Sequence, residues 1–377
     1  MALAYSKEAI KEFALRRLRL TPETLGKNRH DVPVVVSDVG GLQYGGHKIE
    51  LLNRFQSFKE EWFDHWYRNH VLMEGHVLRA ALRIVCADEY PYYFRATRSV
   101  ARRRKYQRCP SSITGRHLLA LKYISDHGPL SPAEFETQLG TEHPELKRVA
   151  NTLIYDLYNH GEIARVGRKK ERPSFHAMEK LPLKREMIRV REKEAREWLL
   201  LKCLSIYGPF SAKDIAHWVG WNISETNETI DTLSERKAIV KVLVEDSRDS
   251  CYLRARDVPL LDSLGKDIPE NSFVRVLFND DALLLGFYRR LESLFGYDWR
   301  YPQFSEGVAW RAAILCGRQI IGEAVIEMYA HSDSLRVKSM ILRRHLVTPR
   351  ILSDIKDQFI MHSEFQRKRL VMRHLVI

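Results

Sequence analysis

The sequence is poor in features that mark several large classes of protein. Its 377 residues include five cysteines, which are Cys86, Cys109, Cys203, Cys251 and Cys316, and they form no Cys-x-x-Cys pair. An odd number of widely spaced cysteines argues against a small domain held by disulfides and against a zinc ribbon.

Long apolar segments are also missing. No run approaches the roughly 18 consecutive apolar residues that a membrane-spanning helix needs. Residues 1–20 mix acids and bases in an amphipathic pattern and lack the apolar centre of a signal peptide. We therefore expect a cytoplasmic protein without membrane contact. No carboxylate cluster with metal-ligand spacing is visible, so we expect no metal and no cofactor, and a metal-dependent phosphodiesterase is disfavoured.

Positive charge is abundant instead. Lys and Arg number 61 against 48 Asp and Glu, a formal net charge of +13. Such a balance favours a polyanionic partner, because neutralising phosphates releases their counterions. The densest run holds seven cations and no acid. Its members are Arg95, Arg98, Arg102, Arg103, Arg104, Lys105 and Arg108. We interpret it as a basic linker that contacts phosphate, although a solvated linker would look similar.

The middle of the chain contains an internal sequence repeat. Residues 118–131 return at 198–211, a constant offset of 80 from 118 to 198, with lysine, serine, glycine, proline and a second serine in register. Each copy reads as an apolar helix ended by Gly-Pro, followed by a serine that caps the next helix. Solenoid repeats have periods of roughly 20–50 residues, so this spacing indicates tandem domains.

Each copy continues with the same order of elements. The first has helical patterns over residues 132–139 and 144–159, then strands over 162–166 and 174–178. The second has a helix over 214–219, a helix capped by Ser224, and strands over 239–244 and 251–254. This order is typical of a winged helix, whose third helix can enter the major groove while the hairpin touches phosphate.

Two groups of cations fall where such a fold would meet DNA. Lys147 and Arg148 lie on the third helix of the first copy, and Arg168, Lys169 and Lys170 lie in its hairpin turn. We therefore predict double-stranded DNA as the partner and a nucleoid-associated location, and no protein partner can be inferred. Winged helices also bind proteins, so the fold alone leaves that alternative open.

The flanking regions complete an α+β chain. Residues 1–108 predict a helical, winged-helix-like domain that ends in the basic linker, and residues 109–184 and 185–262 are the two winged helices. Residues 263–345 predict a small β-rich partial barrel, with strands over 273–278, 309–315, 320–328 and 335–342. Residues 346–377 predict a basic helical tail. Asp280 and Asp281, at a strand end, are either turn residues, the commoner role, or site carboxylates.

Several segments together resemble a known family. They are Gly40-Gly41-Leu42-Gln43, residues 72–85, Asp88-Glu89-Tyr90-Pro91, residues 274–281, residues 289–298 and the hairpin 315–322. In this order they resemble the winged-helix DNA glycosylases of the YcaQ/AlkZ type, closer to the YcaQ branch, over roughly residues 10–345. The resemblance implies hydrolysis of the bond between sugar and base at alkylated or crosslinked nucleotides in DNA repair.

The resemblance also implies a catalytic site, with one departure. The family motif is a glutamine, an apolar residue, and then glutamine or aspartate; here Gln43 and Tyr44 match, and Gly45 does not. A glutamine amide can position water, whereas a carboxylate can also activate it and stabilise positive charge on the sugar. Glu74 falls where the YcaQ branch carries a glutamate and is our candidate for the missing group. His47, Glu50 and His76 are nearby in sequence without support from a motif.

Two interpretations from different classes remain. In the first, the protein is a glycosylase in which Gln43 holds water and Glu74 activates it. In the second, it is a non-catalytic regulator or nucleoid protein descended from that family, holding duplex DNA through residues 144–159, residues 224–236 and the basic run. Gly45 favours the second interpretation, and the similarity along nearly the whole chain favours the first.

Overall fold

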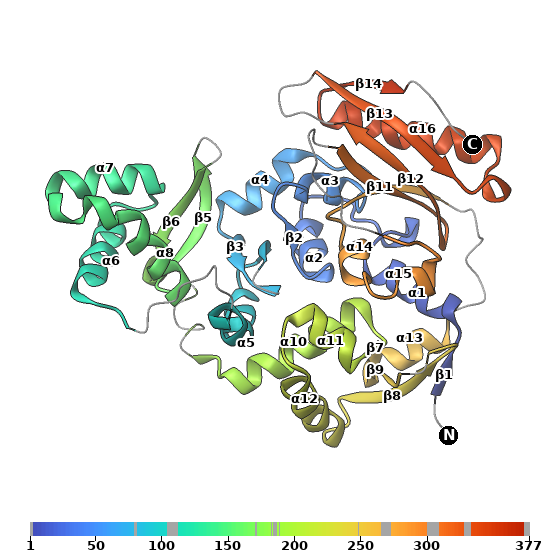
Figure 1. The fold of residues 1–377 in the computed structure, drawn as a ribbon, viewed down its shortest axis with the longest axis horizontal. Coiled ribbons are helices and arrows are strands. Elements are labelled where there is room, and N and C mark those ends of the chain that lie inside the picture. The colour runs from blue at the N-terminus through green and yellow to red at the C-terminus, as the bar shows by residue number, and fades with distance from the viewer. Residues whose placement is uncertain are drawn as a thin grey trace. The chain divides into compact units, whose positions relative to one another are not determined.

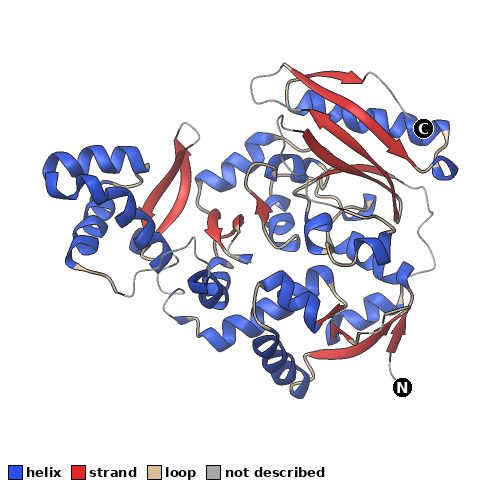
Figure 2. Cartoon of the chain, viewed as in Figure 1, coloured by secondary structure: helices blue, strands red, loops and turns tan. Residues whose placement is uncertain are grey.

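The computed structural model describes residues 3–78, 81–103, 112–169, 172–181, 183, 187, 189–247, 249–264, 273–299, 309–327 and 333–372. They form a mixed α and β fold (Figure 2). The chain divides into two compact units. Unit 1 contains Met1–Phe58, Leu204–Asp214 and Lys237–Ile377, and unit 2 contains Lys59–Cys203 and Ile215–Arg236. Within the described ranges, no helix is both long and apolar enough to span a membrane.

The first repeat copy lies in unit 2 and has the predicted order of elements. Helices α6 (Gly115–His127), α7 (Pro132–Glu142) and α8 (Ala150–His160) lie beside the hairpin of β5 (Ile163–Lys169) and β6 (Arg172–Ala177) (Figure 1). Their apolar faces form one core, which includes Ile124, Phe135, Leu153, Ile154 and Phe175.

The predicted third helix over 144–159 is wrong in one respect. Its first part is the 3-10 helix η3 (Pro144–Val149), and the α-helical part begins only at Ala150. The Lys147 side chain packs closely on Gly140. A Cβ atom at position 140 would come within 2.9 Å of that side chain, so a larger residue does not fit there without a shift. Lys147 and Arg148 thus lie on a 3-10 turn.

The predicted serine caps are confirmed in both copies. Ser131 Oγ accepts a hydrogen bond from the backbone N–H of Glu134, and Ser211 Oγ accepts one from Asp214. In each case the acidic side chain bonds back to the serine N–H, which completes a capping box. Each preceding helix, α6 and α10 (Glu192–Tyr207), ends before the Gly-Pro pair, as predicted.

The second copy differs from the prediction at one cap. Helix α11 spans Ala212–Val219 and α12 spans Ile223–Glu235, and Asn222, not Ser224, caps α12. The Asn222 side chain accepts from the N–H of Glu225, because Asn222 is the last residue with extended backbone dihedral angles.

The hairpin of the second copy belongs to a larger sheet in unit 1. Strands β8 (Ile239–Val244) and β9 (Cys251–Arg254) have the predicted bounds. The N-terminal strand β1 (Leu3–Tyr5) pairs parallel with β8, and β7 (Phe210–Ser211) pairs with β9. The outer edge of this hairpin is therefore covered by the start of the chain.

The predicted basic linker is helical where the structure describes it, over residues 95–103. Helix α5 spans Tyr90–Arg103. Tyr90, Tyr93, Ala96 and Thr97 are buried along one side at helical spacing, and this apolar stripe outweighs the cations on the other positions. Before it, α4 (Glu60–Arg68) leads into the hairpin of β3 (Leu72–His76) and β4 (Leu82–Cys86), and β3 also pairs with β5.

The N-terminal part of unit 1 consists of short elements. Helix α1 (Lys7–Arg17) is capped by Ser6, and α2 (Asp31–Asp38) follows. The strand β2 (Leu42–Gln43) and helix α3 (His47–Leu52) flank the glycine-containing turn at residues 44–46.

The C-terminal part of unit 1 is a curled sheet in the order β10-β11-β12-β13-β14. Its strands are β10 (Val274–Phe278), β11 (Ala309–Cys316), β12 (Gln319–Glu327), β13 (Ser334–Leu342) and β14 (Arg369–Met372). Helix α16 (Pro349–Phe365) packs against the sheet through Ile351, Ile355 and Phe359 (Figure 1). Short helices α13 (Val258–Asp262), α14 (Ala282–Gly286) and α15 (Leu291–Phe295) complete unit 1.

The prediction of a helical tail over residues 346–377 is wrong after α16. Arg367 has a positive φ of 54°, which ends the helical path, and the apolar sequence that follows forms β14. This strand runs parallel to β13, with Leu370 opposite Leu335. Arg373 lies outside the described residues.

One titratable group lies inside this core. His362 of α16 is fully buried beside the ring of Phe278. Burial disfavours the charged imidazolium, and together with the nearby cation of Arg275 it lowers the pKa of His362 to about 3. The folded protein therefore holds this imidazole neutral at pH values where an unfolded chain protonates it.

This difference predicts a pH-dependent stability. Because the unfolded state takes up a proton below about pH 6.5 and the folded state does not until about pH 3, stability falls as the pH drops through that window. Between pH 6.5 and 5 we expect His362 to account for a loss of about 2 kcal/mol, at about 1.4 kcal/mol per pH unit. Urea unfolding of His362→Leu at both pH values should lack this loss. His345→Leu, at an exposed position, is the control, and an unchanged pH dependence in His362→Leu would contradict the prediction.

Candidate functional site

The family motif lies in an irregular turn of unit 1. Gln43 is the last residue of β2 and is half-buried. Gly45 is exposed and has a φ of +103°, a conformation that L side chains rarely adopt. Apart from the two chain neighbours, no atom of the described residues lies within 4 Å of the place where a Cβ of residue 45 would be. The third motif position thus provides open space and no functional group.

The turn continues directly into helix α3. The ring of Tyr44 stacks on that of His47, with 5.3 Å between centroids and 23° between planes. His47 is buried, so its ring fixes one face of Tyr44. Stacking of this kind restricts the motif backbone to one path.

A buried ion pair connects α3 to the turn after β10. The guanidinium of Arg54 is fully buried and donates to both oxygens of Asp281, at 2.7 and 2.9 Å. Glu50 lies 3.5 Å from the same guanidinium, and its carboxylate accepts from the N–H of Ala282 at 3.0 Å. Asn53 donates to the carbonyl of Val276 at 2.8 Å. We call these contacts the Arg54 clamp.

The electrostatics of the clamp favour a permanently charged guanidinium. Burial alone would lower the pKa of Arg54, but the carboxylates of Asp281 and Glu50 raise it above its ordinary value. A fork-like bidentate contact also fixes the relative orientation of its two partners. The clamp therefore holds residues 279–282 against α3.

Asp280 lies beside the motif as a result. A Cβ added to Gly46 would be 3.4 Å from Asp280 Cβ and 3.5 Å from its Oδ2. Asp280 is half-exposed, whereas its neighbours Asn279 and Asp281 are buried. The turn that the sequence predicts at Asp280 and Asp281 is present, but no sequence spacing could relate these residues to Gly46.

Glu74 has a different environment, on β3 in unit 2. Its side chain is fully buried. Arg168 Nε and Nη2 donate to its two oxygens at 2.8 and 2.9 Å, and Tyr67 donates a further hydrogen bond at 2.5 Å. Arg165, directly opposite on β5, is 3.6 Å away. The carboxylate therefore joins the hairpin β5–β6 to β3 through two cations and a hydroxyl.

The predicted DNA-binding cations divide into three groups. Lys147 and Arg148 are exposed on η3. Arg95 donates to the carbonyl of Met187 at 2.6 and 3.1 Å, Arg98 lies over the ring of Phe94, and Arg168 is bound to Glu74. For the others the structure gives only a backbone position or none. Arg102 and Arg103 are on α5, Lys169 ends β5, and Arg104, Lys105, Arg108 and Lys170 lie outside the described residues.

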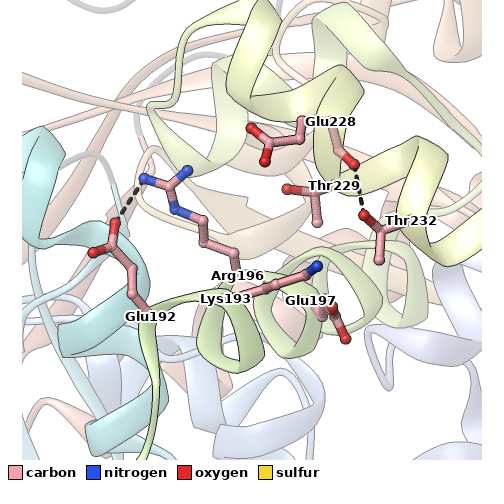
Figure 3. Close-up of a pocket in the computed structure, with 7 residues that line it drawn as sticks. All are labelled: Glu192, Lys193, Arg196, Glu197, Glu228, Thr229 and Thr232. Atoms are coloured by element: carbon pink, nitrogen blue, oxygen red, sulfur yellow. Dashed lines mark hydrogen bonds and ion pairs between the residues drawn. The ribbon is translucent and has the colours of Figure 1, made fainter.

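The third helix of the second copy carries the opposite charge. Helix α12 exposes Glu228, Asp231 and Glu235 and contains no lysine or arginine. Beside it is a hollow lined by α10 and α12, which contains Glu192, Lys193, Arg196 and Glu197 from α10 together with Glu228, Thr229 and Thr232 from α12 (Figure 3). Arg196 is bound to Glu192 at 2.7 Å. An acidic helix face repels phosphate, so the two copies present different surfaces.

The fold is that of a known DNA glycosylase. The structure of Streptomyces sahachiroi DNA glycosylase AlkZ matches with a TM-score of 0.69 at 15% identity, covering 99% of this chain and 100% of that chain. A family model described as DNA glycosylase AlkZ-like matches residues 36–355.

The chain therefore belongs to the AlkZ-like DNA glycosylase family, as the sequence resemblance indicated. Its function is that of a DNA glycosylase-like repair protein, and DNA is its substrate. A search of curated proteins finds no match.

The environment of Glu74 predicts a structural effect of its loss. Glu74→Gln keeps the size of the side chain but leaves the buried Arg165 and the half-buried Arg168 without their anion, so we expect unfolding to become easier by about 3 kcal/mol. Urea unfolding measures this change. Glu197→Gln, which removes a surface partner of Arg236, should cost less than about 1 kcal/mol.

The double variant Glu74→Gln/Arg168→Gln should recover part of the loss, because the two substitutions remove a coupled pair. Unchanged stability of Glu74→Gln with lost base excision would instead support the catalytic role that the sequence suggested.

Proposed function

We propose that this protein is an active DNA glycosylase that hydrolyses the bond between sugar and base at alkylated or crosslinked nucleotides. Membership of the AlkZ-like family carries this proposal. Breaking the bond leaves positive charge on the sugar, and water must be held on the face opposite the departing base. The protein would act wherever the cell keeps its DNA. Whether it is closer to the YcaQ branch stays a prediction.

The motif turn is the proposed water site. Gln43 is half-buried at the end of β2, so its amide combines access to solvent with a fixed backbone. An amide oxygen and an amide N–H can orient a water molecule together. Extrusion of the damaged nucleotide into the site costs a few kcal/mol and is easiest where pairing is already weakened.

The first repeat copy is the proposed DNA-binding module, and we interpret both copies as winged helices. Lys147 and Arg148 are exposed at the start of its third helical segment, where a winged helix meets the groove and its phosphates. The five-part domain division stays a proposal as well. We no longer expect α12 to hold DNA, since its exposed face is acidic.

One observation favours a second candidate, a DNA-binding protein without catalysis. Gly45 supplies neither the glutamine nor the aspartate of the family motif. If no other residue replaces that group, the site would hold water without activating it. The protein would then bind duplex DNA as a regulator or nucleoid component.

The two candidates differ in base excision. Duplex DNA with alkylated purines, and separately crosslinked DNA, is incubated with the protein and then heated in alkali to reveal abasic sites. We expect strand breaks with wild type and about 100-fold fewer with Gln43→Ala, at unchanged DNA affinity. Gln56→Ala, an exposed glutamine after α3, is the matched control. Salt-sensitive binding without breaks on either substrate would support the non-catalytic candidate.

The charge difference between the copies predicts an asymmetry in binding. The double variant Lys147→Ala/Arg148→Ala should bind duplex DNA more weakly, with a salt dependence reduced by about one to two in slope, because each phosphate contact releases a counterion. Fluorescence anisotropy at several salt concentrations measures both quantities. Arg236→Ala, the exposed cation directly after α12, should have little effect. A larger loss in Arg236→Ala would assign DNA binding to the second copy.

A further inference from the structure

The motif turn lacks a carboxylate in its own sequence but has one beside it in space. Position 45 is a glycine with open space in front of it, and the next residue, Gly46, faces Asp280 at 3.5 Å from its would-be Cβ to Oδ2. Asp280 is 235 residues away in sequence from Gly45, by the difference of the two numbers. A Cβ atom at position 46 would be in ordinary van der Waals contact with this carboxylate.

The surrounding carboxylates have structural roles. Asp281 accepts hydrogen bonds from Nη1 and Nη2 of Arg54, and Glu50 bridges Arg54 and the N–H of Ala282. Both are buried, at 3% and 4% exposure, whereas Asp280 is only half-buried. Among these three acids, Asp280 is the one that solvent or a substrate can reach.

Its position is also fixed. The clamp holds Asp281 and Ala282 on one side of Asp280, and the bond from Asn53 to the Val276 carbonyl holds β10 on the other. A catalytic group needs such support, because small displacements of a reacting group cost large factors in rate.

We propose that Asp280 is the catalytic carboxylate of this glycosylase, in place of the side chain that Gly45 lacks. The inference rests on the proposed glycosylase function. The water oxygen held by Gln43 attacks C1′ of the sugar, and the bond between C1′ and the base nitrogen breaks with its electron pair leaving on the base. Asp280 accepts the proton that the water releases. An alkylated, cationic base departs neutral, so no further proton donor is required.

Asp280→Asn tests the assignment, since it keeps the shape and removes the charge. In single-turnover excision of alkylated purines we expect a rate about 100-fold below wild type, with unchanged DNA affinity and melting temperature. Asp249→Asn, the same change at an exposed position in unit 1, should excise like wild type.

One further variant and a folding control separate chemistry from folding. Asp280→Glu keeps a carboxylate and should retain more activity than Asp280→Asn. The circular dichroism spectra and melting temperatures of both variants show whether they fold like wild type.

The outcomes distinguish the role of Asp280 from the proposed glycosylase function. Wild-type rates in Asp280→Asn, together with lost excision in Gln43→Ala, would overturn the role of Asp280 and leave the glycosylase function intact. Equal loss in Asp280→Asn and Asp280→Glu, both with native melting temperatures, would likewise overturn it. Absence of excision by wild type would overturn both proposals.

Discussion

The bidentate contact between Arg54 and Asp281 is the constraint on which the candidate site depends. It is fully buried, and a buried guanidinium is tolerable only when its charge and its donors are matched. Asp281 and Glu50 provide that match, and in doing so they join the helix after the motif to the turn after β10. Two segments more than two hundred residues apart are thereby joined, and Asp280 lies beside Gly46.

Glu74 and Asp280 illustrate how similar residues acquire different roles. Glu74 lies in a segment that resembles the family, and Asp280 follows the end of strand β10. Glu74 is enclosed by Arg168, Arg165 and Tyr67 and stabilises the junction between β3 and the hairpin. Asp280 is held at the surface of the motif turn by its neighbours' contacts. The two carboxylates thus differ in burial and partners, which the sequence does not display, and the catalytic role predicted for Glu74 stays a prediction.

The repeat shows a similar divergence. Both copies keep the Gly-Pro helix end and the serine capping box, because these are local devices that a few residues specify. Their surfaces differ: the first exposes Lys147 and Arg148, and the second exposes a row of acids on α12. In addition, β1 covers the edge of the second hairpin. We interpret the second copy as a module of the same fold whose exposed surface does not bind DNA.

The family, the duplicated order of helices and hairpin, the two serine caps and most strands of the C-terminal sheet could be predicted from the residues alone. Each of these depends on periodicity or on neighbours within a few residues. The helical path of the basic run up to Arg103, the cap of α12 by Asn222 and the strand in the tail could not be predicted, because buried faces and pairing partners override local preference. The approach of Asp280 to Gly46 and the enclosure of Glu74 are long-range contacts. They arise only in the folded chain, since the ion pairs that fix these carboxylates join residues 227 and 94 positions apart.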